Sequence, residues 1–219
     1  MKNFLQIASG VDVMPLLLEI QRQPELWNRN PCRLGKIAPH HETQDIILRY
    51  KDDRPGMGDF NEWLKFSDEH IPEWYHAADF LPSARKIIFD LMARVQGEML
   101  GGVFLYKLEP GKKIYPHKDW GWHPEFYEKF NICLSSNESA GFGYECGEMM
   151  RQRPGDVHHF RNENCHFVIN DGGTDHIVLT VCIKLDRGAR IPFAPEGWSM
   201  DDQVEATCQQ RGSAQAQQS

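Results

Sequence analysis

The chain has 219 residues, the size of one ordinary domain or of one domain with a substantial extension. Its formal net charge of -7 disfavours a globally basic nucleic-acid binder, because neutralisation of phosphates supplies most of that affinity. With 41% hydrophobic and 25% charged residues the composition is typical of a folded globular protein, and no apolar run approaches the roughly 20 residues of a membrane-spanning helix.

The N-terminal sequence and the cysteines both bear on the compartment. The first residues lack a long apolar stretch followed by a small-residue cleavage site, so we expect no secretory signal peptide. The six cysteines are scattered and form no Cys-x-x-Cys pair, which favours reduced, mostly buried thiols over a disulfide framework or a zinc ribbon. We therefore expect a cytoplasmic protein.

Residues 1–102 are predicted to form a helical and mixed N-terminal part. The spacing of apolar residues predicts a first helix over 12–23. A second, stronger helical repeat begins near Ser83 and is expected to end at Gly101-Gly102. This second helix is expected to cover one face of a sheet.

After the second helix the sequence changes to short β-like segments that are separated by turn residues. Six strands are expected, over residues 103–109, 114–118, 130–135, 156–161, 165–170 and 176–185. Turns are expected between strands at Pro110-Gly111, Ser139-Ala140-Gly141, Pro154-Gly155 and Asp171-Gly172-Gly173. This pattern predicts a compact antiparallel barrel or sandwich.

The predicted elements indicate a single mainly β domain over residues 1–196. Its β core is expected over 103–187, with the helical N-terminal part as a layer against it. Residues 197–219 are polar and cannot bury much surface, so we expect them to form a disordered tail.

A metal-binding pattern follows the second predicted strand. His117 and Asp119 are two residues apart, and on an extended backbone such side chains project from the same face. One imidazole and one carboxylate are two thirds of the facial triad of non-haem iron(II) oxygenases. The His-x-Asp pattern alone also occurs by chance, as a hydrogen-bonded surface pair. A third ligand from another strand is therefore needed.

Three histidines further along the chain could supply the third ligand. His166 heads a predicted strand on which His166, Val168 and Asn170 share one face, and we favour it. His158 and His159 are adjacent, so at most one of them can face the barrel interior. We expect them at a polar edge, and either would become the alternative ligand if His166 were structural.

The same part of the chain resembles a known enzyme family. The matching segments are LYKLEPGKKIYPHKD, FNICLSSN, a Gly-Glu turn, PGDVHHFRNENCHFVIN and a strand that ends near KLD. Over residues 105–186 the sequence is similar to the aspartyl/asparaginyl β-hydroxylase and proline-hydroxylase-like branch of the iron(II)/2-oxoglutarate dioxygenases. The resemblance implies a double-stranded β-helix, a jelly-roll or cupin-like barrel. It also implies Fe(II) held by His117, Asp119 and His166, with 2-oxoglutarate as the co-substrate.

The resemblance also indicates where the co-substrate would bind. The family usually has an arginine ten residues after the distal histidine, and this chain has His176 at that position. Arginine and histidine are not equivalent at a site that binds a carboxylate through two hydrogen bonds, so another oxo-acid is an open alternative. We expect Tyr106, Lys129, Asn131 and His176 to contact the co-substrate.

Further side chains are expected around the mouth of the barrel, each with a plainer alternative. An aromatic segment is either a packed loop or the wall of a substrate pocket, and it contains Trp120, Trp122, His123, Phe126 and Tyr127. Three arginines are expected on a solvated rim or against an acidic ligand: Arg151, Arg153 and Arg161. Two histidines are expected in a solvated loop, unless their segment covers the mouth: His40 and His41.

The resemblance implies an oxygenase that hydroxylates an amino-acid side chain, free or within a polypeptide. Two functions of other classes stay open. The missing arginine suits a degenerate, non-catalytic cupin-like binding module, and the same three ligands suit a zinc- or manganese-dependent hydrolase or isomerase. An amino acid or polypeptide is the expected partner, and nucleic acid and membrane are not. The sequence does not specify an oligomeric state.

Overall fold

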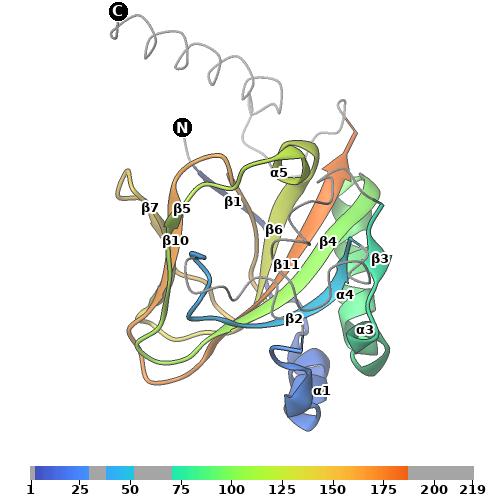
Figure 1. Cartoon of the computed structure of the whole chain (residues 1–219), viewed down its shortest axis with the longest axis horizontal. Helices are drawn as coiled ribbons and strands as arrows, with labels where there is room; N and C mark the ends of the chain where they lie inside the picture. The colour runs from blue at the N-terminus through green and yellow to red at the C-terminus, as the bar shows by residue number, and fades with distance from the viewer. Residues whose placement is uncertain (1–2, 30–37, 52–70, 187–219) are drawn as a thin grey trace, which may run out of the picture.

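The computed structural model describes residues 3–29, 38–51 and 71–186 (Figure 1). Its elements, in chain order, are β1 (Phe4–Ala8), α1 (Met14–Arg22), the 3-10 helix η1 (Pro24–Leu26), β2 (Gln44–Tyr50), β3 (Glu73–Trp74), α3 (Ala77–Phe80), α4 (Pro82–Val95), β4 (Gly97–Leu108), β5 (Lys113–His117), α5 (Trp122–Phe126), β6 (Glu128–Ser135), β7 (Ala140–Tyr144), β8 (Met149–Met150), β9 (Val157–Phe160), β10 (His166–Asn170) and β11 (His176–Leu185).

The described strands form two antiparallel sheets. The larger sheet has seven strands in the order β1-β9-β6-β11-β4-β2-β3, and the smaller has four in the order β5-β10-β7-β8. From β4 to β11 the chain passes back and forth between the two sheets, which is the winding of a double-stranded β-helix (Figure 1). The predicted mainly β fold is confirmed.

The interior between the sheets is filled by an apolar cluster to which both sheets contribute. The larger sheet supplies Tyr106, Leu108, Phe160 and Val178, and the smaller supplies Ile114, Phe142, Tyr144, Met150 and Val168. Along β4 and β11 alternate residues point inward, because successive side chains of a strand project to opposite faces. The smaller sheet is therefore anchored to the larger one through this interior.

A second apolar core lies on the outer face of the larger sheet. There α4 packs on β4 and β11, and α1 packs on α4. Leu16 of α1, Ile88 of α4 and Leu105 of β4 are fully buried in this core. The predicted helical layer over one face of the sheet is confirmed.

The second predicted helix ends earlier than the sequence pattern indicates. Helix α4 ends at Val95, and Gln96 adopts a left-handed backbone conformation with φ 56° before β4 begins. The expected stop at Gly101-Gly102 is wrong, because both glycines lie inside β4. A Cβ on Gly101 would lie 2.7 Å from the ring of Tyr127, so this position needs a glycine for close packing.

The N-terminal part also contributes strands that the sequence pattern did not indicate. Strands β1, β2 and β3 join the larger sheet, and the expected boundary between residues 102 and 103 falls inside β4. The expected turn at 139–141 is met only at Ser139, since the turn ends there and Ala140 begins β7. Gly141 and Gly143 are small residues against which Met149 and Phe167 pack closely, so they serve packing rather than a turn.

The expectations for the cysteines, for membrane-spanning helices and for the tail have different outcomes. Four of the cysteines are described and all are free, but only Cys133 and Cys182 are buried, whereas Cys146 is exposed. In the parts of the chain that the structure describes, no helix is long and apolar enough to cross a bilayer. The predicted tail over 197–219 lies outside the described residues.

Candidate metal centre

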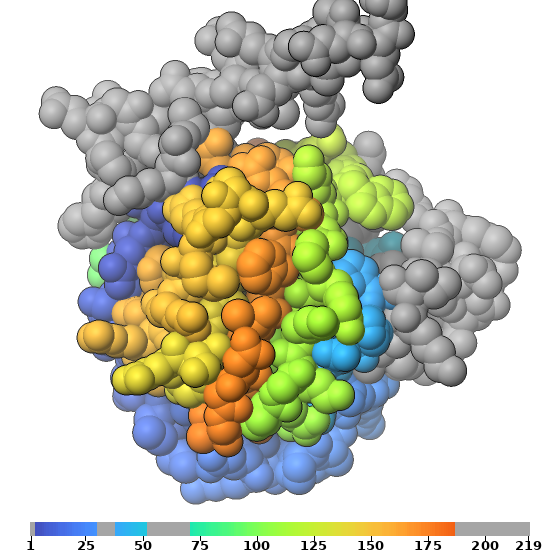
Figure 2. All heavy atoms as spheres, turned by 90° about the vertical axis from the view of Figure 1, so that its left-hand side faces the viewer, coloured from blue at the N-terminus to red at the C-terminus, as the bar shows by residue number. Residues whose placement is uncertain are grey.

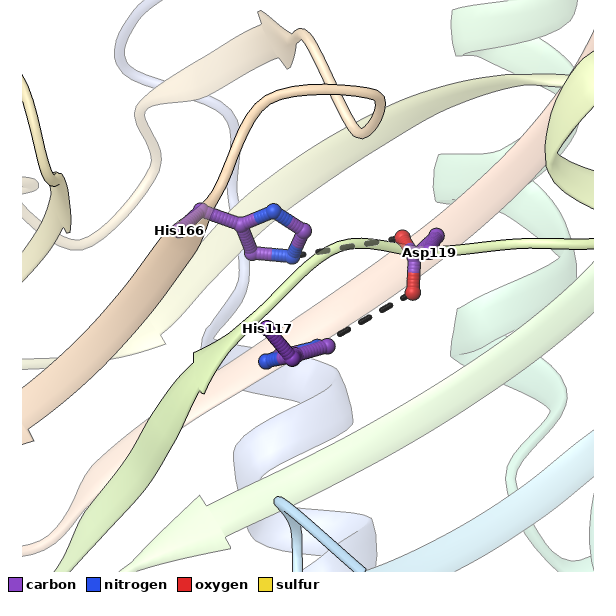
Figure 3. Close-up of side chains that lie close together, drawn as sticks. All are labelled: His117, Asp119 and His166. Carbon is purple, nitrogen blue, oxygen red and sulfur yellow. Dashed lines mark ion pairs between the residues drawn. The ribbon is translucent and has the colours of Figure 1, made fainter. Parts of the chain in front are cut away.

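The structure brings the three expected metal ligands together at one end of the smaller sheet. His117 ends β5 and His166 begins β10, and the two residues are direct partners in the antiparallel pairing of these strands. Asp119 Oδ1 lies 3.9 Å from His117 Nε2, and Asp119 Oδ2 lies 3.9 Å from His166 Nε2 (Figure 3). The ligand atoms of all three residues lie within 4.8 Å of one another, which is close enough to share one ion.

Both imidazoles are oriented by the backbone two residues earlier. His117 Nδ1 lies 2.8 Å from the carbonyl oxygen of Tyr115, and His166 Nδ1 lies 2.8 Å from that of Asn164. A carbonyl oxygen can only accept, so each Nδ1 carries the hydrogen and each Nε2 keeps its lone pair. The lone pairs are then available on the side of Asp119, as metal binding requires.

The charges at the centre favour the protonation states of metal ligands. Burial by itself would raise the pKa of Asp119. The charge of Lys129, the hydrogen bond from its Nζ to Oδ2 at 2.5 Å, and the neighbouring His166 and His117 together outweigh burial and lower the pKa to about 2. Burial lowers the pKa of His166 to about 4. At neutral pH the centre therefore presents an ionised carboxylate and an uncharged imidazole at position 166.

A cavity of about 220 Å³ opens beside the three residues. The share of liquid volume that one water takes is about 30 Å³, so this cavity has room for several waters or a small organic acid. Its described lining is mostly aromatic and apolar, with a few polar groups, as in typical ligand sites. It consists of His40, Tyr50, Phe104, Tyr106, Ile114, His117, Asp119, Trp120, His123, Pro124, Lys129, Asn131, Phe142, Phe160, His166, Val168 and Thr180.

Three of the four residues expected at the co-substrate line this cavity: Tyr106, Lys129 and Asn131. Lys129 is the one lysine or arginine among the described lining residues, and its ammonium group contacts Asp119. Asn131 Oδ1 accepts a hydrogen bond of 2.7 Å from Thr180 Oγ1. The inner wall therefore offers one cation, one amide and hydroxyl groups.

His176, the fourth residue of that set, does not line the cavity. Its Nδ1 lies 3.0 Å from Ser136 Oγ, and its ring centroid is 6.1 Å from that of Tyr106. Burial lowers the pKa of His176 to about 4, so the ring is uncharged at neutral pH. A protonated imidazole that pairs with a co-substrate carboxylate is disfavoured at this position.

The expectation that His158 and His159 lie at a polar edge is wrong. Strand β9 lies between β1 and β6 in the larger sheet, so both residues are buried. His158 Nδ1 is 3.4 Å from Gln152 Nε2, and His159 Nε2 is 2.6 Å from a carboxylate oxygen of Glu128. Neither histidine belongs to the cluster of potential metal ligands in the described chain.

The aromatic segment after Asp119 divides between its two expected roles. Trp120 and His123 line the cavity, and Trp120 is 80% exposed at the same time. The other three residues of the segment are Trp122, Phe126 and Tyr127. They pack in a separate apolar cluster with Ile47, Phe104 and Cys182. The segment therefore forms part of the pocket wall and part of a packed loop.

The three arginines expected near the mouth do not line the cavity. Arg151 donates a hydrogen bond of 3.0 Å to the carbonyl oxygen of Ala140, and Arg161 lies 3.9 Å from Glu163. Arg153 is exposed. Their plainer interpretation, a solvated rim, agrees with the exposed Arg151 and Arg153 but not with Arg161, whose side chain is only 11% exposed.

His40 is the main cavity residue whose position the sequence pattern did not decide. Its ring centroid lies 4.8 Å from that of His117, so its segment covers the mouth rather than standing in solvent. No local sequence pattern indicates this contact. The position of Thr180, in contrast, was predictable, because the alternation along β11 places Thr180 on the same face as His176 and Val178.

Comparison with known proteins supports the fold. No protein-family model matches the sequence, and no curated protein is similar to it in sequence. A solved oxidoreductase of the 2OG-Fe(II) oxygenase family from Burkholderia pseudomallei superposes with a TM-score of 0.52 at 15% identity, covering 88% of this chain and 89% of that one. At this identity the likeness establishes a shared fold.

Two other solved structures are similar over different shares of the chain. A viral collagen prolyl hydroxylase from Paramecium bursaria Chlorella virus-1, in complex with 2OG, gives a TM-score of 0.47 at 11% identity, covering 84% of this chain and 97% of that one. A cupin domain from Bordetella pertussis Tohama I gives a TM-score of 0.33 at 15% identity, covering 40% of this chain and 84% of that one.

Proposed function

We propose that this protein is an iron(II)- and 2-oxoglutarate-dependent dioxygenase that hydroxylates an amino-acid side chain, free or within a polypeptide. The convergence of two imidazole Nε2 atoms and one carboxylate beside a small cavity carries the proposal. Three protein ligands on one side of an ion leave the other coordination positions for a co-substrate and oxygen. The motif resemblance and the shared fold support this assignment.

The donor set fits Fe(II). His117, Asp119 and His166 would hold the ion through two nitrogens and one oxygen, which is the two-histidine, one-carboxylate arrangement of non-haem iron enzymes. When bound, Fe(II) would activate O2: one oxygen atom would enter the C–H bond of the substrate, and the other would enter succinate as 2-oxoglutarate gives up two electrons and loses carbon dioxide.

The residues of the inner cavity wall fit a dicarboxylic oxo-acid. Lys129 would bind a carboxylate of 2-oxoglutarate, in the role that an arginine has in the family. Thr180, Asn131 and Tyr106 would provide hydroxyl and amide groups along the same wall. Lys129 contacts Asp119 at the same time, so it also holds the carboxylate ligand in its ionised form.

The substrate would enter past the aromatic side of the cavity. Trp120 and His40 lie on segments far apart in the sequence, and both line the space beside the metal ligands. Such a lining excludes water from the reacting centre, which protects a reactive intermediate from side reactions. The apolar wall suits the methylene groups of an amino-acid side chain.

Anaerobic addition of Fe(II) followed by 2-oxoglutarate tests the proposal, with visible absorption as the readout. The wild-type protein is expected to develop a charge-transfer band, and His117→Ala is expected to lack it. His76→Ala is the matched control, because His76 is exposed, forms an ion pair with Asp79 and is not among the described residues that line the cavity. In air, mass spectrometry of candidate amino acids and peptides should show the gain of one oxygen.

Other results of the same experiment would favour the other functions. Tight zinc or manganese retention with no effect of 2-oxoglutarate would indicate a hydrolase or isomerase. A wild-type protein that takes up no metal would indicate a non-catalytic binding module. Either result contradicts the oxygenase.

A further inference from the structure

Both histidines of the metal centre depend on backbone carbonyls that are themselves held by more distant groups. The carbonyl of Tyr115 receives the Nδ1–H of His117, and that of Asn164 receives the Nδ1–H of His166. A shift of either carbonyl would rotate the imidazole and turn Nε2 away from Asp119. The groups that fix residues 115 and 164 therefore bear on metal affinity.

A glutamate holds the strand that carries the first carbonyl. β5 is an edge strand of the smaller sheet, so its outer N–H groups have no neighbouring strand. Glu42 Oε2 accepts the N–H of Lys113 at 3.0 Å, and Glu42 Oε1 accepts the hydroxyl of Tyr115 at 3.2 Å. The backbone N–H of Tyr115 donates to the carbonyl of Pro39 at 3.0 Å.

The ring of Tyr115 is fixed from the same segment. The ring of His41 stacks on it with centroids 4.8 Å apart and an interplanar angle of 18°. Figure 2 shows residues 38–50 in light blue beside β5 in green, at the border of the smaller sheet. Glu42 thus joins a segment from early in the chain to the strand that ends in a metal ligand.

A second glutamate acts on the other carbonyl through one asparagine. Glu148 Oε2 accepts both the backbone N–H of Asn3, at 3.0 Å, and its Nδ2, at 2.8 Å. Because a carboxylate only accepts, the amide nitrogen of Asn3 must face Glu148, and Oδ1 then faces the other way. Asn3 Oδ1 accepts Asn164 Nδ2 at 2.8 Å, next to the carbonyl that orients His166.

We propose that Glu42 and Glu148 are positioning residues of the metal centre, each fixing the segment whose backbone carbonyl orients one histidine ligand. The inference rests on the proposed metal binding by His117, Asp119 and His166. On each side, hydrogen bonds run from a glutamate carboxylate to Tyr115 or Asn164, and the backbone carbonyl of that residue accepts the Nδ1–H of the histidine. In each of these hydrogen bonds the donor and the acceptor are unambiguous. Neither glutamate belongs to the cluster of potential metal ligands or to the described lining of the cavity.

Titration of the metal-free protein with Co(II), followed by its d–d absorption spectrum, tests the inference. Glu148→Gln and Glu42→Gln are each expected to weaken Co(II) binding by about 10- to 100-fold, the effect typical of groups that orient metal ligands. The spectrum of the residual complex should change, because the imidazole geometry changes. Asp90→Asn, which removes a carboxylate paired with Lys86 on α4, should leave both unchanged.

The melting temperatures of the same metal-free variants separate positioning from general stability. Lowered melting temperatures with Co(II) affinity and spectrum as in the wild type would overturn the inference. A further variant, Asn3→Asp, places a second carboxylate against Glu148 and is expected to weaken Co(II) binding as well. A wild-type protein that binds no Co(II) would instead overturn the proposed metal centre on which the inference rests.

Discussion

The two sheets of the barrel have different supports and different tasks. The larger sheet is backed by α1 and α4, whose buried apolar residues form a continuous core with it. The smaller sheet supplies both histidines of the candidate metal centre, and in the described chain no helix covers its outer face (Figure 2). Stability and metal binding are therefore expected to respond to different substitutions.

The difference shows why the fold can hold a reactive centre on its less protected side. The smaller sheet is fixed from within by the apolar interior, and at its borders by polar contacts from early parts of the chain. These directional contacts define the positions of individual atoms, which a metal site requires and apolar packing alone does not provide.

The largest effect is expected from a ligand substitution in the smaller sheet. His166→Ala should abolish tight binding of Fe(II), because it removes one of the three donor atoms of the centre. Circular dichroism should show the same β fold as the wild type. Fe(II) binding is measured anaerobically by competition with a chelator, and undiminished affinity would separate His166 from the centre.

A substitution in the core between the larger sheet and its helices should lower stability and leave metal affinity unchanged. Leu105→Ala removes a fully buried side chain on the outer face of the larger sheet and should cost about 2–5 kcal/mol of unfolding free energy. Metal affinity, measured well below the melting temperature, should stay at the wild-type value. Leu18→Ala on the exposed side of α1 is the control for denaturant unfolding, and equal losses in both variants would contradict the core assignment.

The buried His176 makes the stability of the larger sheet depend on pH. Burial lowers its pKa from 6.5 to about 4, so between these values the unfolded chain binds a proton that the folded chain does not. The free energy of unfolding should therefore fall as pH decreases through this window, by up to about 3 kcal/mol. In metal-free His176→Gln the decrease should be smaller, as urea unfolding across this range will show. An unchanged decrease would contradict the assignment.

A smaller effect is expected at the cavity residue that links the two sheets. Lys129 lies on β6 of the larger sheet and contacts Asp119, which follows β5 of the smaller one. Lys129→Met should weaken 2-oxoglutarate binding by about 1.5–3 kcal/mol, the typical contribution of a hydrogen bond to a charged group. The matched change Lys184→Met removes a surface ion pair with Glu98 and should leave the affinity unchanged. Calorimetric titration measures both.

The parts of the site that were predictable from sequence are those with a local pattern. His117 and Asp119 are two residues apart, and His166 lies on an alternating strand, so spacing alone suggests a shared face. His40 has no such signal, because its position beside His117 depends on contacts with β5, more than seventy residues away in sequence. Non-local contacts of this kind leave no trace in a single sequence.

The errors in the fold have the same origin. Gly101 and Gly141 were interpreted as a helix stop and part of a turn, the usual local meaning of glycine. In the structure both are strand residues on which a side chain from another segment packs closely. His176 shows the same limit for the prediction of functional residues. Its spacing from His166 matches the family pattern, but its ring is not part of the described cavity lining.

Anomalous X-ray diffraction from crystals prepared anaerobically with Fe(II) and 2-oxoglutarate tests the central claim most directly. The account predicts one iron peak within bonding distance of His117 Nε2, His166 Nε2 and a carboxylate oxygen of Asp119, with oxygens of the co-substrate bound to the same ion. Iron at another place, or a His166 imidazole turned away from His117 and Asp119, would contradict it.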